Sequence, residues 1–483
     1  MSSDFAEHNP VATSKLGKQA VVVGAGIAGV SAAAALADSF DHVILVERDG
    51  PANGEPRHGT PQAHHCHGLL AGGLSALAEL FPGIEQDLLR AGSVALRLNQ
   101  DLREELPDGS VMPQRDFGLT GCSMSRPLLE STLYSRILQR GNLTLRHHTQ
   151  ALGILTDPDG QRVTGIQCVA KPAQAQSEAR VETLAADIVV DATGRGQLTA
   201  TLLQALGRGP IYLSTIGIDL NYTTAIMAAE HDVLQAVLTH NRPPSSRRAV
   251  MLPIEGNRWM LSVVGRGPER PPGDWPGVLG HLQQLPTRTL YEVARNAKPL
   301  GELTRFGVTQ SIWRHFERVE AWPDGLIPIG DAVCRFNPVY GQGMSVAAIQ
   351  ARLLQRMLRE AAARPDPIQG LGKALVTAEK PWIETPWTMA AIPDFAVPGT
   401  RGERPAGLER SLRFAQSLRR LAARDPEVQR VVVEVWHMLR SRSALDDPRL
   451  VQRVEAEMEA MEQAEHAAAS AVALRASGLR SSA

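Results

Sequence analysis

One stretch near the N-terminus, residues 18–48, constrains the fold more than any other part of the chain. The β-branched run Val21–Val23 is typical of a buried parallel strand, and it leads directly into residues 24–29, GAGIAG. An alanine-rich stretch with high helix propensity follows, and then a second apolar run, His42–Val46, that ends in Glu47. This succession of strand, glycine turn, helix, strand and acid predicts a dinucleotide-binding βαβ unit.

Each part of this unit has a physical role. Gly24 permits the tight turn, Gly26 lets the backbone approach a pyrophosphate, and Gly29 allows close packing of helix on strand. The helix N-terminus offers unpaired N–H groups to phosphates, and Glu47 is predicted to accept hydrogen bonds from an adenosine ribose. A secretory or membrane segment over Ala20–Ala37 is disfavoured, because that run carries glycines at phosphate-binding spacing.

Composition excludes several classes of function. A net charge of −1 gives the chain no field that would recruit nucleic acid or an anionic membrane surface. The four cysteines are scattered without a CxxC pair, which predicts reduced thiols, no disulfide framework and no zinc site. No Ser-His-Asp or Cys-His set stands at motif spacing, so hydrolase chemistry has no support. These features favour a cytoplasmic α/β enzyme.

Two further motifs follow apolar strands. The run Ile188–Val190 leads into residues 191–194, DATG, and the run Leu326–Ile329 leads into the pair Gly330-Asp331. A loop at 338–343, PVYGQG, then precedes a long predicted helix.

Together with GAGIAG and Glu47, these motifs resemble the glutathione-reductase-type FAD fold of the flavoprotein monooxygenases related to p-hydroxybenzoate hydroxylase. The resemblance extends over about residues 18–400. Within that superfamily, residues 57–67, RHGTPQAHHCH, and 81–83, FPG, resemble the flavin-dependent epoxidases of polyether antibiotic pathways, of the lasalocid and monensin types.

The resemblance implies an α/β protein with a glutathione-reductase-type FAD-binding fold, an interleaved mainly-β substrate domain and a C-terminal helical region. The predicted segments are a mobile arm over 1–17, a first FAD-binding part over 18–210, a substrate-domain sheet over 211–300, a second FAD-binding part over 301–380, and a substrate cap with C-terminal helices over 381–483.

The resemblance also assigns FAD-binding roles to residues that match the family's motifs. These residues are Gly24, Gly26, Gly29, Glu47, Arg126, Ala151, Leu152, Asp331, Pro338, Gly341, Gly343 and Met344. Arg126 is implied to contact the phosphates or the ribityl chain, Asp331 a ribityl hydroxyl, and Ala151 or Leu152 the adenine. The 338–344 segment is implied to lie along the flavin ring, with N–H donors toward the end where reduced flavin carries negative charge.

Residues 57–67 supply the candidates for the flavin face, which are Arg57, Gln62, His65 and His67. The histidines at 58, 64, 65 and 67 fit no zinc spacing, so no metal site is predicted. Three interpretations stay open: a hydrogen-bonding loop over the flavin edge, histidines that cap and pack, and a covalent histidyl-flavin. No general base is assigned.

The implied function is that of an FAD-dependent monooxygenase, acting through a flavin C4a-hydroperoxide in epoxidation or hydroxylation, within secondary metabolism. The substrate is expected to be a small molecule, polyketide- or terpenoid-like, and the co-substrate O2. Because one dinucleotide fingerprint is present, NAD(P)H is expected to bind transiently, or a separate flavin reductase to supply FADH2. The Trp-x-Trp-x-Ile-Pro signature of flavin halogenases is absent, which disfavours chlorination.

Alternatives of other classes remain open. One is an FAD-dependent reductase of prenyl double bonds, similar to geranylgeranyl reductases, and another is a non-catalytic flavin-binding scaffold. The predicted helices at 409–424 and 427–440 could bind a membrane or pack on the FAD domain. Their polar faces carry both charge signs, so packing is favoured and membrane association is not expected.

Overall fold

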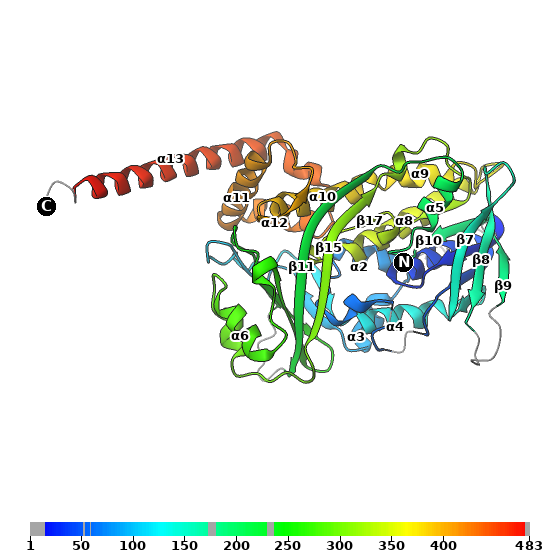
Figure 1. The fold of residues 1–483 in the computed structure, drawn as a ribbon, viewed down its shortest axis with the longest axis horizontal. Helices are drawn as coiled ribbons and strands as arrows, with labels where there is room; N and C mark the ends of the chain where they lie inside the picture. The colour runs from blue at the N-terminus through cyan, green and yellow to red at the C-terminus, as the bar shows by residue number, and fades with distance from the viewer. Residues whose placement is uncertain (1–14, 52–53, 58, 172–179, 229–235, 479–483) are drawn as a thin grey trace, which may run out of the picture.

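The structure is a computed structural model that describes residues 15–51, 54–57, 59–171, 180–228 and 236–478. A parallel-sheet unit and a large, mostly antiparallel sheet lie side by side, and the C-terminal helices pack at one side of both (Figure 1). Residues 1–14 of the predicted arm, and His58, lie outside the described residues.

The first unit is built on a five-stranded parallel sheet. In spatial order its strands are β16 (Leu326–Pro328), β10 (Ile188–Asp191), β1 (Gly17–Val23), β2 (Phe40–Val46) and β6 (Leu143–Arg146). All neighbouring strands are parallel. The segments that follow β1, β2, β10 and β16 therefore meet at one edge of the sheet, which is where such sheets bind ligands.

Helices cover this sheet. The helices of this unit are α1 (Ile27–Ala37), α2 (Ala71–Leu80), α3 (Ile84–Arg90), α4 (Arg126–Ile137), α5 (Leu198–Ala205) and α8 (Gly343–Ala361). Helix α1 packs against α8, and residues Ala32–Leu36 have no exposed surface. The apolar run at 20–37 is thus a strand, a turn and a core helix.

Two small antiparallel sheets border the first unit. Their strands are β3 (Val94–Arg97) with β5 (Thr120–Ser123), and β7 (Thr149–Thr156) with β8 (Val163–Ala170) and β9 (Val181–Ala185). Strands β7 and β8 pair antiparallel as a hairpin. The backbone N–H of Thr149 donates to the Glu47 carbonyl at 2.8 Å, so β7 begins beside the end of β2.

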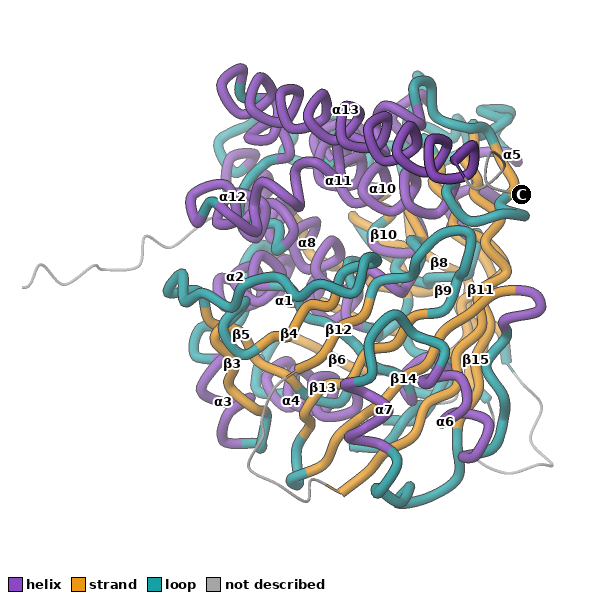
Figure 2. The backbone as a smooth tube through the Cα atoms, turned by 90° about the vertical axis from the view of Figure 1, so that its left-hand side faces the viewer, coloured by secondary structure: helices purple, strands orange, loops and turns teal. Residues whose placement is uncertain are grey.

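The second unit is an eight-stranded sheet. Its strands in spatial order are β17 (Cys334–Arg335), β15 (Thr304–Arg314), β11 (Leu213–Ala228), β14 (Arg258–Arg266), β13 (Arg248–Ile254), β12 (Ala236–Thr239) and β4 (Leu102–Glu105), with β18 (Arg401–Gly402) paired to β11. The sheet therefore draws strands from both sides of the predicted range 211–300. Helices α6 (Trp275–Gln283) and α7 (Thr289–Ala294) pack on one face, and the other face is turned toward the first unit (Figure 2).

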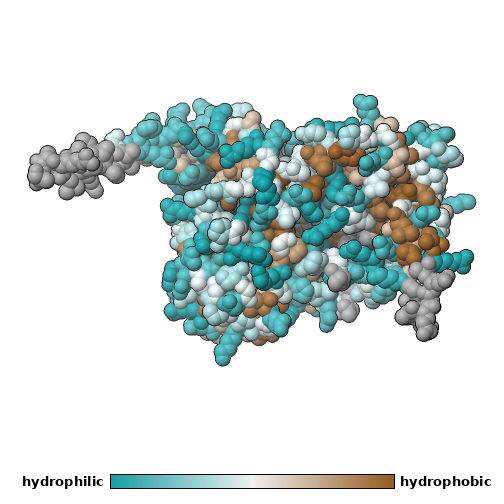
Figure 3. All heavy atoms as spheres, viewed as in Figure 1, coloured by the Kyte–Doolittle hydropathy of each residue, from teal (hydrophilic) through white to brown (hydrophobic). Residues whose placement is uncertain are grey.

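The C-terminal region is helical. Its helices are α9 (Leu371–Ala378), α10 (Lys380–Phe395), α11 (Leu408–Arg424), α12 (Pro426–Trp436) and α13 (Pro448–Gly478). Leu418, Val428 and Val454 belong to one buried cluster that joins α11, α12 and α13. Helix α13 extends away from the body (Figure 1), and its described surface is mainly hydrophilic (Figure 3). No helix in the described part of the chain is long and apolar enough to cross a bilayer.

The C-terminal region and its flank contain three tryptophans, Trp382, Trp387 and Trp436. All three are half-buried and pack against the main hydrophobic core. The Gln429 side chain in α12 donates to the Pro113 carbonyl at 2.7 Å, which ties the helical region to the first unit.

Candidate functional site

The glycine turn after β1 is closed on one side and open on the other. A Cβ at Gly29 would lie 1.7 Å from the Gly24 carbonyl oxygen, and a Cβ at Gly24 would lie 2.5 Å from the Ala192 oxygen. A Cβ at Gly26, in contrast, would meet only the Arg57 Nη2 atom, at 4.0 Å. The turn is therefore packed where helix meets strand and free where a ligand can approach the N-terminus of α1.

Three buried charged side chains and a fourth that is partly buried lie beside this open side. Arg57 Nη1 donates to Glu47 at 3.0 Å, and Arg57 Nε donates to Glu130 at 2.9 Å. Glu130 also accepts from Arg126 Nε at 2.9 Å. Burial opposes ionisation of Glu130, yet the charges and hydrogen bonds of Arg126 and Arg57 hold its pKa below the usual value. The ionised Glu130 carboxylate thus holds both guanidinium groups in place.

One donor of this network has no partner in the described structure. Arg57 is 8% exposed, and its Nη2 atom is buried without a hydrogen bond. A buried guanidinium N–H left unpaired is costly, which indicates that a ligand accepts it. The position beside Gly26 fits a diphosphate, so these residues fit the expected FAD. Arg57, predicted at the flavin face, lies here beside the glycine turn.

Glu47 is engaged by the protein itself. Its Oε2 atom accepts from the Ala25 N–H at 2.8 Å, and its Oε1 atom accepts from the Asp49 N–H at 2.9 Å. Each carboxylate oxygen has two lone pairs, so Oε1 keeps capacity for a ribose hydroxyl. Ala151 and Leu152 lie nearby on β7, which begins beside β2; Ala151 is half-buried and the Leu152 side chain is 48% exposed.

In the second motif, residues 191–194, the carboxylate is hydrogen-bonded by threonines close to it in the sequence. The Asp191 carboxylate accepts from the N–H and hydroxyl of Thr193 and from the N–H and hydroxyl of Thr199. Asp191 therefore holds the loop after β10 against Gly24 and has no free lone pair directed at a ligand.

Asp331, in contrast, has a carboxylate with no hydrogen-bond partner among the described residues. Burial raises its pKa, although the charges of Arg126, Arg335, Arg195 and Arg314 act against that shift. A Cβ at Gly343 would lie 3.9 Å from Asp331 Oδ1, so Asp331 stands at the N-terminus of α8. A free carboxylate among arginines beside a helix N-terminus fits the hydroxyl-rich ribityl chain.

The loop before α8 approaches the histidine-rich segment. Pro338 opens a short 3-10 helix that ends at Gly341, where φ is +68°. A Cβ at Gly341 would lie 3.6 Å from the Gly68 Cα atom. Beyond this contact, Gly343 and Met344 begin α8, and their N–H groups have no intrahelical partner.

The histidine-rich segment lies over the large sheet. His65 Nδ1 is 2.7 Å from the Thr224 hydroxyl, and the His65 ring packs against both Tyr222 and Phe306 at centroid distances of 5.6 and 5.5 Å. His67 Nδ1 is 2.7 Å from the His65 carbonyl and so donates to it. Gln62 is half-buried in the 3-10 turn Pro61–His64.

Both histidines are neutral at physiological pH. Burial, reinforced by His64, lowers the pKa of His65 to about 4. Burial and the charge of Arg126 lower the pKa of His67 to about 3. No group of three or more potential ligands in the described residues could hold a metal ion.

His65 predicts a measurable pH dependence of stability. An unfolded histidine binds a proton near pH 6.5, whereas folded His65 does so near 4. The free energy of unfolding should therefore fall as pH drops from about 6.5 to about 4, by at most ~1.4 kcal/mol per pH unit from this residue. Urea unfolding at several pH values should show a shallower dependence for His65→Gln. His466→Gln, on the exposed side of α13, is the control; parallel curves for wild type and His65→Gln would contradict the prediction.

Several site residues carry no local sequence signal. Arg314 Nη1 donates to the Asp331 and Ala332 carbonyls at 3.2 Å each. These two hydrogen bonds hold the loop after β16 in place. Tyr222 and Arg248 on the large sheet face the histidine segment and the 338–341 loop. Glu130 alone could have been found, because it follows Arg126 at helical i,i+4 spacing.

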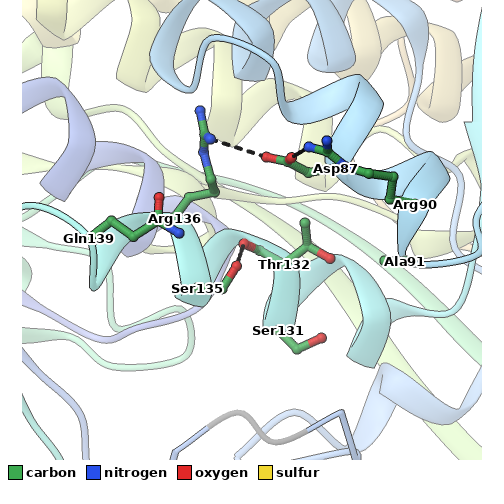
Figure 4. A pocket seen from close by; sticks show the side chains of 8 residues that line it. All are labelled: Asp87, Arg90, Ala91, Ser131, Thr132, Ser135, Arg136 and Gln139. Carbon is green, nitrogen blue, oxygen red and sulfur yellow. Dashed lines mark hydrogen bonds and ion pairs between the residues drawn. The ribbon is translucent and has the colours of Figure 1, made fainter.

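A hollow on the described surface lies elsewhere. It has a volume of about 350 Å³ and opens between α3 and α4 (Figure 4). Asp87 at its rim pairs with Arg136 at 3.3 Å and with Arg90. None of the residues predicted to bind FAD lines it, and its charges pair with one another, so it is not a candidate for the site.

Comparison with known proteins yields a family model and relatives. The model of the FAD dependent oxidoreductases matches residues 19–202. Protein Rv3254 of Mycobacterium tuberculosis is 32% identical over 411 residues, which cover 80% of this chain and 84% of that protein. Digeranylgeranylglycerophospholipid reductase 1 of Methanopyrus kandleri is 27% identical over 350 residues, or 72% of this chain and 81% of the reductase.

Solved structures share the fold at low identity. The flavin-dependent brominase Bmp2 aligns with a TM-score of 0.62 and 13% identity, over 93% of this chain and 99% of its own. PqsL, a probable FAD-dependent monooxygenase from Pseudomonas aeruginosa, aligns with a TM-score of 0.55 and 17% identity, over 77% and 96%. At these identities the likeness concerns the fold alone, and it confirms the predicted α/β FAD-binding architecture.

Proposed function

Because the chain belongs to the FAD-dependent oxidoreductase family, we propose that it is a flavin monooxygenase that transfers one oxygen atom from O2 to an organic substrate. The observation that carries the proposal is the contact of Gly341 with Gly68. This contact closes the loop before α8 against the segment that lies on the substrate-side sheet. Such a contact would help to keep water from a flavin bound beside it, which oxygen transfer by a reduced flavin requires.

The residues that would hold FAD form one line across the sheet edge. The turn at 24–29, with Arg57 and Arg126, would bind the diphosphate, Glu47 the ribose, and Asp331 the ribityl chain. FAD, once bound and reduced, would supply the activation of O2.

The chain's own residues would control charge around the flavin ring. The N-terminus of α8 offers the free N–H groups of Gly343 and Met344 and the positive end of the helix dipole, which stabilise negative charge on the ring. His65 and His67 stay neutral and so add no competing cation. No side chain is assigned as a general base.

We further propose epoxidation or hydroxylation of a polyketide- or terpenoid-like molecule in secondary metabolism, in line with the resemblance to polyether epoxidases. The single dinucleotide fingerprint supports transient binding of NAD(P)H or supply of FADH2 by a separate flavin reductase.

A second candidate is a reductase of prenyl double bonds. It is supported by the 27% identity to the Methanopyrus kandleri reductase. Such an enzyme would transfer hydride to an alkene and would need no O2.

One experiment separates the two candidates. The purified flavoprotein is photoreduced without oxygen and then mixed rapidly with O2 while the visible spectrum is recorded, with free reduced FAD as the control. For a monooxygenase we expect a transient spectrum that matches neither reduced nor oxidised flavin. Direct return to oxidised flavin, also in the presence of alkenes and phenols, would contradict the monooxygenase and favour the reductase.

A further inference from the structure

Three polar side chains meet at the end of the large sheet where β11 begins and β15 ends. The Ser214 hydroxyl lies 2.8 Å from His315 Nε2, and His315 Nδ1 lies 2.8 Å from the Glu317 carboxylate. Lys373 of α9 donates to the Glu317 carbonyl at 2.7 Å, so the cluster lies beside that helix (Figure 1). A serine, an imidazole and a carboxylate in one hydrogen-bonded chain are the groups that activate a serine for attack on a carbonyl carbon. Motif spacing did not reveal them, because Ser214 is 101 residues from His315.

The cluster lies on the opposite side of β15 from the predicted FAD site. Side chains alternate between the two sides of a strand, and Arg314, which precedes His315, donates to the Asp331 carbonyl at 3.2 Å. His315 instead stacks on Trp313, with ring centroids 4.2 Å apart. The predicted FAD-binding residues therefore do not include any member of the cluster, and the proposed oxygen transfer makes no use of it.

The hydrogen bonds fix the protonation of the cluster. Burial opposes ionisation of Glu317, yet the hydrogen bond from His315 and the charge of Lys380 hold its pKa below the usual value. An ionised carboxylate can only accept a hydrogen bond, so the proton of the neutral imidazole is on Nδ1. His315 Nε2 is then unprotonated, and the Ser214 hydroxyl donates to it. This is the tautomer in which His315 can take the serine proton.

The serine can be reached from outside, whereas the histidine is protected. Ser214 is half-buried and His315 is 5% exposed. The ring of Tyr212 packs on the His315 ring at a centroid distance of 5.1 Å, and Tyr212 is 46% exposed. The Arg318 guanidinium lies 4.0 Å from the centroid of the Tyr212 ring. A small molecule at Ser214 would therefore meet an apolar ring and a positive charge.

A backbone donor is free one residue after the serine. The His315 N–H donates to the Tyr212 carbonyl at 3.0 Å, so the alternation of an antiparallel pair directs the Thr215 N–H away from β15. On that other edge β18 pairs with β11 only over residues 216–217, and among the described residues the Thr215 N–H has no acceptor. In many serine hydrolases the N–H after the nucleophile donates to the oxygen anion that forms on attack.

We propose that Ser214, His315 and Glu317 form a second active site, which hydrolyses small carboxylic esters. Ser214 Oγ forms a bond to the carbonyl carbon, its proton passes to His315 Nε2, and the Thr215 N–H binds the oxygen anion. The bond to the alkoxy oxygen then breaks, and the alcohol leaves with that proton. Water next attacks the acyl group, and His315 transfers the proton of the water to the departing Ser214 oxygen. The net reaction converts one ester and one water into an acid and an alcohol, without an oxidant or a reductant.

The test uses the FAD-loaded protein in its oxidised state. One probe is a fluorophosphonate, which reacts covalently with activated serines, and mass spectrometry of the intact protein and of its peptides counts and locates the label. The other is p-nitrophenyl acetate, whose hydrolysis releases p-nitrophenol above the constant flavin absorbance. We expect a single label per chain, on Ser214, and hydrolysis that falls at least tenfold after labelling. Neither readout depends on O2 or on reduced flavin, so the oxygen experiment and this one can fail separately.

Three variants make the test specific, and FAD content and unfolding temperature report whether each is folded. Ser214→Ala should lose the label and hydrolyse the ester at least tenfold more slowly. Glu317→Gln keeps the size of the side chain but removes its charge, and it should slow labelling and hydrolysis at least tenfold. The matched control is Ser131→Ala, because Ser131 is also half-buried but donates to the Leu128 carbonyl, at 3.0 Å, rather than to a histidine. This variant should react as wild type does.

Other results would overturn the proposal. These are the absence of a label in the wild-type protein, a label spread over several serines, or hydrolysis that is unchanged in Ser214→Ala. Wild-type rates in Glu317→Gln would show that the carboxylate does not orient His315 for catalysis. If Ser214→Ala fails to fold, the peptide map of the labelled wild-type protein still decides whether Ser214 is the nucleophile.

Discussion

Replacing Asp331 by alanine is expected to give a folded protein that purifies largely without FAD. A hydrogen bond to a charged acceptor contributes about 2–3 kcal/mol, so the affinity for added FAD should fall roughly 30- to 150-fold. The fold should persist, because burial already raises the pKa of Asp331 and its carboxylate pairs with no described side chain. The measurements are the flavin-to-protein absorbance ratio after purification and a fluorescence titration of the apoprotein with FAD.

The matched control is Asp38→Ala. Asp38 ends α1 on the far side from the glycine turn, where it forms an exposed ion pair with Arg140 at 2.9 Å. This variant should keep its FAD. Full FAD occupancy in Asp331→Ala would show that the carboxylate has been assigned the wrong role.

Replacing Gly29 by alanine is expected to destabilise the fold itself, by more than about 4 kcal/mol. The new Cβ would lie 1.7 Å from the Gly24 carbonyl oxygen. That oxygen is a backbone atom and the Cβ is fixed directly to the backbone, so neither can move without separating α1 from β1. We expect insoluble protein, or soluble protein with a much lower unfolding temperature and no flavin. Circular dichroism during heating measures the effect.

The variant Gly26→Ala tests FAD affinity separately from the stability of the fold. Its Cβ would meet only Arg57 Nη2, at 4.0 Å, so the apoprotein should unfold at nearly the wild-type temperature. The methyl group would instead occupy the space that a diphosphate needs, and FAD affinity should fall. Stable, flavin-loaded Gly29→Ala protein, or equal unfolding temperatures for the two variants, would contradict this division of roles.

The sequence predicted those features that depend on the backbone conformation or burial of a few neighbouring residues. The glycine turn must follow a buried strand and open a helix, and no other residue type fits Gly24 or Gly29. Strands β1, β2, β10 and β16 were recognisable for a similar reason, because burial on both faces demands an apolar run. Asp331 follows such a strand, and its ribityl role was implied by the family resemblance.

The features that the sequence did not predict depend on partners far along the chain. Arg57 contacts Glu130, 73 residues away, and this pairing holds Arg57 at the glycine turn. Strand alternation places Arg248 on one face of β13. The sequence does not show that Asp394, in α10, accepts hydrogen bonds from Arg266 and Asn337. In the same way, the internal hydrogen bonds of Asp191 could not be inferred from the DATG motif.

The order of strands in the parallel sheet has a consequence for biosynthesis. Strand β1 is complete at Val23, yet β16, which covers the outer edge of β10, ends about 300 residues later, at Pro328. At roughly 5–20 residues per second, a ribosome needs about 15–60 s to add them. Throughout that interval the nascent chain exposes an apolar strand edge, and the residues expected to hold FAD are not all present. We therefore expect chaperone capacity during translation, more than the stability of the finished protein, to limit the yield of soluble enzyme.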